Sequence, residues 1–85
     1  MHYLVEYNND EAYEDREIFP VGIFDDLHQA AQFAVQYEKD NPGRYSTVFG
    51  QFHGHCTVAQ WDGAKEIHVW ESDQLPALAE LDFTI

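Results

Sequence analysis

The chain has 85 residues and a formal net charge of −12, because 16 acidic residues face only four lysines and arginines. Apolar residues make up 45% of the chain and aromatic residues 15%, which is enough for one packed core and excludes a disordered acidic tail. We expect a single domain, residues 1–85, with no cofactor and little room for a deep substrate cavity. The charge disfavours direct binding to nucleic acid or to an anionic membrane, and it favours a basic protein surface as the partner.

The single cysteine, Cys56, excludes an internal disulfide bond, which suits a reducing compartment. The first residues lack the basic and apolar regions of a signal peptide, and no run approaches the roughly 20 apolar residues that span a bilayer. The sequence therefore predicts a cytoplasmic protein.

The first half of the chain alternates strand and helix signals. Residues 3–7 and 17–24 predict two strands, joined by an acidic loop over 8–15. Pro20 has no N–H group, so we expect the second strand to lie at a sheet edge or to be broken there. Residues 26–40 predict the main helix, with an N-cap at Asp25 or Asp26, an apolar stripe at helical spacing, and a stop at Asn41-Pro42-Gly43.

The second half predicts a third strand over 45–53 and then a β-hairpin, 55–61 and 64–71, around Asp62-Gly63. A two-residue turn at this dipeptide pairs Trp61 with Ala64, Val58 with Ile67, and Cys56 with Val69. The predicted core face then carries Cys56, Val58, Ile67 and Val69, and the predicted outer face carries His55, Thr57, Trp61, His68 and Trp70.

Residues 72–82 predict a short C-terminal helix with Pro76 in its first turn and Leu75, Leu78 and Leu81 facing inward. The whole order predicts an α+β domain: a small antiparallel sheet of four to five strands, one main helix packed on it, and a short C-terminal helix.

Histidines and a thiol occur together in His53-Gly54-His55-Cys56, with His68 nearby, but the spacing argues against a zinc site. Neighbouring residues of a strand point to opposite faces, so His55 and Cys56 do not reach one ion, while His55 and His68 share a face and would still need another ligand. Burial and nearby carboxylates are expected to raise the pKa of Cys56, which disfavours a thiol nucleophile. No catalytic motif is present, and we expect neither an enzyme nor a bound metal.

The acidic residues near the second strand and the two tryptophans are the predicted partner-binding residues. The acidic residues flank or lie in that strand and fall into two groups, one at each of its ends, so they predict two patches instead of one. The tryptophans are typical interface anchors, although the face that carries them could equally pack under the helix. The full set is Asp10, Glu11, Glu14, Asp15, Glu17, Asp25, Asp26, Trp61 and Trp70.

The stretch Val21-Gly22-Ile23-Phe24-Asp25-Asp26-Leu27-His28-Gln29-Ala30-Ala31 is similar to a pattern common in small phage and bacterial proteins, in which a strand runs into a capped, alanine-bearing helix. By size, acidity and α+β pattern the chain also resembles phage-encoded anti-defence proteins, which include anti-CRISPR proteins and DNA-mimic anti-restriction proteins. This resemblance implies a cytoplasmic inhibitor in a bacterial host cell that binds a defence complex over its nucleic-acid-binding surface.

The leading hypothesis is therefore a non-catalytic phage or mobile-element inhibitor whose carboxylates meet a basic, nucleic-acid-binding protein surface, either as a DNA mimic or as a simple complement to a basic patch. A generic acidic surface is the alternative explanation of the charge. The other functional hypotheses are an interaction module, monomer or homodimer, that uses the aromatic sheet face, and a small metal-binding enzyme.

Overall fold

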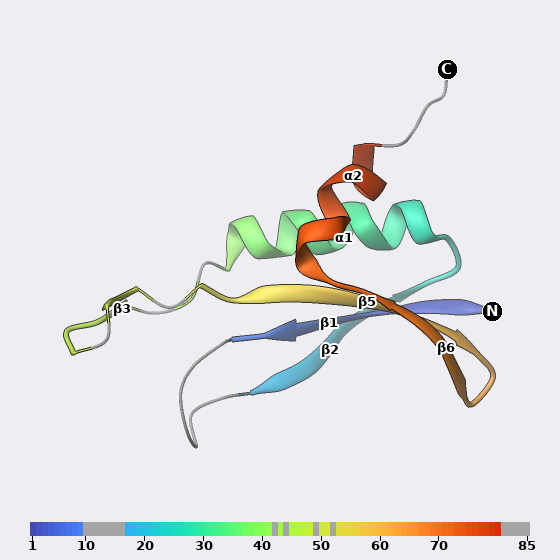
Figure 1. Ribbon diagram of the computed structural model, residues 1–85, viewed down its shortest axis with the longest axis horizontal. Helices are drawn as coiled ribbons and strands as arrows, with labels where there is room; N and C mark the ends of the chain where they lie inside the picture. Colours follow the sequence, from blue (N-terminus) through green and yellow to red (C-terminus); the bar gives the residue numbers. More distant parts are fainter. Residues whose placement is uncertain (10–16, 42, 44, 49, 52, 81–85) are drawn as a thin grey trace.

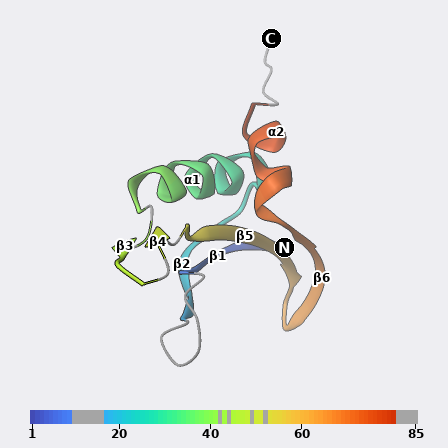
Figure 2. The ribbon, with the colours of Figure 1, turned by 60° about the vertical axis from the view of Figure 1, so that its left-hand side comes forward.

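The computed structural model describes residues 1–9, 17–41, 43, 45–48, 50–51 and 53–80. Four strands form one antiparallel sheet in the order β2-β1-β5-β6. Both α-helices lie over the same face of this sheet (Figure 1, Figure 2). The elements are β1 (His2–Asn8), β2 (Ile18–Phe24), α1 (Leu27–Asp40), β3 (Tyr45–Ser46), β4 (Gly50–Gln51), β5 (His55–Asp62), β6 (Lys65–Trp70), the 3-10 helix η2 (Ser72–Gln74) and α2 (Leu75–Glu80). The expected α+β architecture is confirmed.

Strand β2 lies at an edge of the sheet, as Pro20 predicts. In the pairing with β1, Val5 faces Gly22 and Glu6 faces Pro20, so Val21 is an extra residue that forms a β-bulge. A proline is tolerated at such a position because its nitrogen has no hydrogen to give to a neighbouring strand.

Helix α1 begins one residue after the expected start, because Asp26 is the N-cap and its carboxylate accepts a hydrogen bond from the His28 N–H group at 3.4 Å. The helix presents Ala30, Ala31 and Ala34 to the sheet, and all three are fully buried. Their small side chains let the helix backbone come close to the sheet, so α1 packs on the sheet through the predicted apolar stripe.

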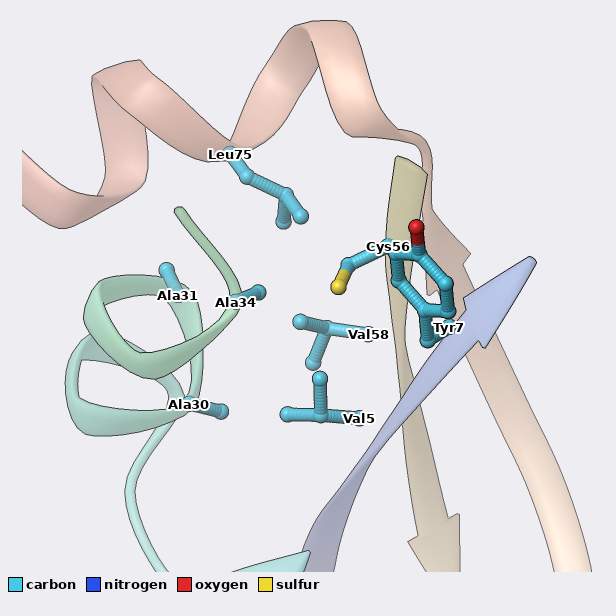
Figure 3. Close-up of a cluster of buried hydrophobic side chains, with 8 residues drawn as sticks. All are labelled: Val5, Tyr7, Ala30, Ala31, Ala34, Cys56, Val58 and Leu75. Atoms are coloured by element: carbon cyan, nitrogen blue, oxygen red, sulfur yellow. The ribbon is translucent and has the colours of Figure 1, made fainter. Parts of the chain in front are cut away.

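The core lies between α1, α2 and the two central strands (Figure 3). Strand β1 contributes Val5 and Tyr7, β5 contributes Cys56 and Val58, and α2 contributes Leu75. The Tyr7 hydroxyl donates a hydrogen bond to the carbonyl oxygen of Asn41 at 2.7 Å, which ties the end of α1 to β1. Within the described ranges, no helix is long and apolar enough to cross a bilayer.

The prediction of one strand over residues 45–53 is wrong. The chain reverses within this segment, and β3 and β4 pair with each other in a separate two-stranded sheet, Tyr45 with Gln51 and Ser46 with Gly50. Gly50 has φ of 88°, in the left-handed region that glycine adopts most readily, and this conformation supports the reversal.

The predicted register of the β5–β6 hairpin is also wrong. Asp62 pairs with Lys65, so the turn centres on Gly63 and Ala64, and Gly63 has φ of 64°. The partner of Trp61 is Glu66 and the partner of Gln60 is His68, which leaves Ile67 as an extra residue in a bulge. The pairing that results is Val58 with Trp70 and Ala59 with Val69.

This register changes which side chains of β6 face the helices. Cys56 and Val58 are fully buried under the helices, as predicted. Ile67, however, is 47% exposed, and Val69 lies opposite Ala59 on the other face. A shift of pairing by an odd number of residues moves each side chain to the opposite face of a strand, so two of the four predicted core residues of the hairpin are misplaced.

The C-terminal segment begins as the 3-10 helix η2 and continues as α2, over most of the range predicted for one helix. Leu75 is fully buried and Leu78 packs against the core, as expected. Leu81 lies outside the described residues.

Candidate protein-binding site

The acidic residues that the sequence proposes for binding are separated by strand β2. Glu17 precedes this strand, whereas Asp25 and Asp26 follow it, and all three are exposed. A seven-residue strand is roughly 23 Å long at ~3.3 Å per residue. These carboxylates therefore do not form one patch, in agreement with the expected separation into two. The proposed residues Asp10, Glu11, Glu14 and Asp15 lie outside the described residues.

Asp26 has a structural role in addition to its charge. Its carboxylate caps α1, and Asp26 has the extended backbone, with φ of −131° and ψ of 129°, that an N-cap residue adopts. Asp25, its neighbour, is exposed, and the carboxylate that caps α1 is that of Asp26. Asp25 is thus the residue at this end of β2 whose charge can be changed without altering the helix start.

The two tryptophans do not share a face, so the predicted outer aromatic face is wrong. Trp70 pairs with the buried Val58, lies on the helix-bearing side, and contacts His68 and Tyr3 with ring-centroid distances of 4.5 and 6.3 Å. Trp61 is one residue out of phase with Gln60 and points to the other side. Its indole nitrogen is buried without a hydrogen-bond partner.

The face of the sheet opposite α1 and α2, called here the open face, carries a continuous row of apolar side chains. Cα pairing joins Ile23 to Leu4, Leu4 to Ala59, and Ala59 to Val69, so the row crosses all four strands. Ile23 is 66% exposed, Leu4 and Val69 are partly buried, and Ala59 is buried between them. In the described part of the chain, both α-helices lie on the other side (Figure 2).

Each long side of this apolar row carries a carboxylate. On one side, Glu6 stands between Pro20 and Thr57. On the other side, Trp61 stands between His2 and Glu66. The open face is therefore an apolar band between two acidic positions.

The sequence alone does not show this row, because the row depends on the register of β5 and β6. Leu4 and Ile23 occur in strands that also carry inward-facing apolar residues, and the predicted pairing of the hairpin places Val69 in the core. A signal was nevertheless present in the sequence. Residues 4, 23 and 69 are apolar and lie next to other apolar residues in their strands, which is typical of strands with apolar side chains on both faces.

On the helix side, one carboxylate links three elements. Glu38 of α1 accepts hydrogen bonds at its Oε2 atom from the Cys56 N–H group, at 2.6 Å, and from the Ser72 hydroxyl, at 2.7 Å. Strand β6 ends at Trp70, before it reaches the level of Cys56. The Glu38 carboxylate therefore accepts the hydrogen bond that a neighbouring strand would otherwise accept from this N–H group of β5. The contact fixes the junction of α1, β5 and η2.

The Cys56 thiol is poorly suited to nucleophilic chemistry. Burial, and secondarily the negative charge of Glu38, raise its pKa from the ordinary value of 9.0 to about 12. The thiol is therefore protonated at neutral pH, and its side chain has no exposed surface. The expected direction of the pKa shift is confirmed, and Cys56 is a core residue.

The histidines and Cys56 are distributed over both faces of the sheet. His55 is one residue out of phase with the buried Cys56, and the register places His68 on the helix-bearing side, so the expected diagonal pair of His55 and His68 is wrong. Among the described residues, no group of three or more histidine, cysteine, aspartate or glutamate side chains is placed to hold a metal ion.

A shallow hollow of about 380 Å³ lies where β6 leaves the sheet, and it is lined by His55, Glu71, Ser72 and Asp73. Its two carboxylates add to the negative potential at this end of β5. Comparison with family models, with curated proteins and with solved structures finds no match to this chain.

Proposed function

We propose that this chain is a non-catalytic binding protein that engages a basic surface of another protein. The observation that carries this proposal is the placement of its charge. Of the eleven described acidic residues nine are exposed, against two described lysines, Lys39 and Lys65. The exposed acidic residues are Glu17, Asp25, Asp26, Asp40, Asp62, Glu66, Glu71, Asp73 and Glu80.

Such a surface has a physical consequence for its partners. It produces a negative potential that repels phosphates and accelerates encounter with lysine- and arginine-rich proteins. The state of Cys56 supports a binding role over thiol catalysis, because a buried thiol with its pKa raised to about 12 supplies almost no thiolate at neutral pH.

The specific form we propose is an inhibitor, encoded by a phage or mobile element, of a bacterial defence complex that binds nucleic acid. A basic groove that accepts DNA or RNA also accepts a folded domain rich in carboxylates. The two then compete through the same salt-dependent electrostatics. The proposal rests on charge, size and the resemblance in type to anti-defence proteins.

A capture experiment with the immobilised protein tests the electrostatic part. Bacterial lysate is applied, and bound proteins are eluted by raising salt from roughly 50 to 500 mM, which shortens the screening length to below about 5 Å. We expect the captured proteins to be nucleic-acid-binding proteins that salt releases and that added duplex DNA displaces. Capture that is unchanged across this salt range refutes the proposal.

Two charge-reversed variants locate the contact. Glu17→Lys with Asp25→Lys changes the charge at both ends of β2 and leaves the Asp26 cap intact. Asp73→Lys with Glu80→Lys changes the net charge by the same amount on η2 and α2. If the carboxylates around β2 make the contact, the first variant loses capture and the matched variant retains most of it. An equal loss in both variants means that total charge, and not this location, determines binding.

A further inference from the structure

The open face is a chemically specific surface in addition to an acidic one. Its apolar row, Ile23, Leu4, Ala59 and Val69, is continuous because each member is the register partner of the next. In a sheet with one face in solvent, each strand ordinarily alternates apolar residues toward the core with polar residues toward solvent. Here the outer side of all four strands is apolar at the same level.

The charges beside the row favour a partner surface of positive charge. Glu6 and Glu66 border it on opposite sides. The described lysines lie elsewhere: Lys39 is in the last turn of α1, and Lys65 is at the tip of the β5–β6 hairpin opposite Asp62. A second copy of the chain would bring like charges together on this face, which is unfavourable, whereas a basic partner would neutralise them.

The size of the face selects the kind of partner. Four strands ~4.8 Å apart, each six to eight residues long at ~3.3 Å per residue, give a face of roughly 19 by 20–26 Å. This is on the order of 400–500 Å², about half of the ~800 Å² per partner that a standard protein interface buries. It is too small for a stable homodimer, but an amphipathic helix ~10 Å wide can lie on it.

We propose that the open face docks an amphipathic basic segment of a partner protein, with apolar side chains against Ile23, Leu4 and Val69 of the row, which are exposed or partly exposed around the buried Ala59, and with lysine or arginine against Glu6 and Glu66. The segment spans ~10–13 residues if it is helical and follows the row across the sheet. This inference rests on the proposed function, because it names the surface and the partner class for the same binding activity.

The probe is a synthetic peptide of leucine and lysine, 14 residues long, with its leucines on one helical face. A second peptide has the same composition with the leucines scattered, and an oligolysine of equal charge is the third. We expect the amphipathic peptide to bind the full chain at least tenfold more tightly than the other two. In amide NMR spectra, it should shift Leu4, Ile23, Ala59 and Val69 more than the residues of α1. Equal affinity for all three peptides overturns the inference and leaves the proposed function standing.

Two pairs of variants separate the apolar and the charged contributions. Ile23→Thr with Val69→Thr shortens both ends of the row and keeps β-branched side chains in the strands, while Val48→Thr makes a similar change on an 80% exposed residue away from the sheet. We expect the row variant to lose at least fivefold in affinity for the amphipathic peptide and the control to change less than twofold.

Glu6→Gln with Glu66→Gln removes the two bordering charges, and Asp73→Asn with Glu80→Gln removes the same number elsewhere. Only the first pair of substitutions should lower the affinity for the amphipathic peptide fivefold or more. Equal effects from both pairs overturn the inference. Sedimentation that shows a dimer dissociating on Ile23→Thr and Val69→Thr also overturns it, because the face would then bind a second copy. Salt-independent capture from lysate would instead refute the proposed function.

Discussion

The Glu38 contact offers the sharpest test of how this small fold is held together. Glu38→Ala would leave the Cys56 N–H group and the Ser72 hydroxyl without their common acceptor, Oε2 of Glu38. Cys56 is fully buried and Ser72 is partly buried, so water replaces the lost acceptor only in part. The junction of α1, β5 and η2 should therefore weaken.

The size of the effect follows from the two bonds. A hydrogen bond to a charged group contributes about 1.5–3 kcal/mol, and two bonds to one oxygen add less than their sum. We expect Glu38→Ala to lower the free energy of unfolding by roughly 2–4 kcal/mol. For a domain of this size each kcal/mol corresponds to ~4–8 °C, so the melting temperature should fall by roughly 10–30 °C.

Urea unfolding followed by circular dichroism measures this loss, and a double-mutant cycle with Ser72→Ala isolates the coupling between the two side chains. Gln36→Ala is the matched control, because Gln36 is an exposed residue of the same helix whose side chain contacts Asp40. It should change stability by less than about 0.5 kcal/mol. A loss below about 1 kcal/mol for Glu38→Ala, or an effect of Ser72→Ala that is the same with and without Glu38, refutes the structural role.

Three further predictions concern the core and the helix start. Because burial raises the pKa of Cys56 to about 12, the folded chain keeps its thiol proton above pH 9 while the unfolded chain loses it. Stability should therefore fall by up to ~1.4 kcal/mol per pH unit between pH 9 and 12, and urea unfolding of Cys56→Ala over the same range should lack this component. Gly54→Ala would place a Cβ atom against the Tyr7 ring and hydroxyl; it should cost about 1–3 kcal/mol in thermal unfolding, with partial recovery by Tyr7→Phe. Asp26→Ala should cost ~1 kcal/mol through loss of the α1 cap, and a melting curve in which Asp26→Asn loses as much as Asp26→Ala would contradict the capping role.

The parts of the fold that the sequence predicts are those set by local chemistry. Asp26 caps α1 and the alanines at helical spacing face the sheet, so helix position follows from a few neighbouring residues. Pro20 marks an edge strand for an equally local reason, its missing N–H group. Cys56 and Val58 are apolar positions two residues apart in one strand, and burial of both follows from the period of the strand.

The register of the β5–β6 hairpin, in contrast, could not be predicted from neighbouring residues. Asp62-Gly63 signals a turn, but the turn centres on Gly63 and Ala64, and a bulge at Ile67 then shifts the pairing again. The later turn moves each partner on β6 by two residues, which leaves the faces unchanged. The bulge adds one more residue, and this odd total shift places Trp70 on the helix side and Val69 on the open face. The candidate site depends on this register, so composition predicts an acidic surface but could not predict the apolar row.

The two edges of the sheet are poorly suited to pairing with a strand of another protein. An unpaired edge strand ordinarily invites another strand to pair with it. Here both outer strands carry an extra residue, Val21 in β2 and Ile67 in β6, and β2 also carries Pro20. Bulges and proline interrupt the ladder of N–H and C=O groups that strand addition requires. Net negative charge also opposes the stacking of two copies of the chain. The interrupted edges, the apolar row and the bordering carboxylates together favour a basic partner that lies across the open face over one that adds a strand to the sheet.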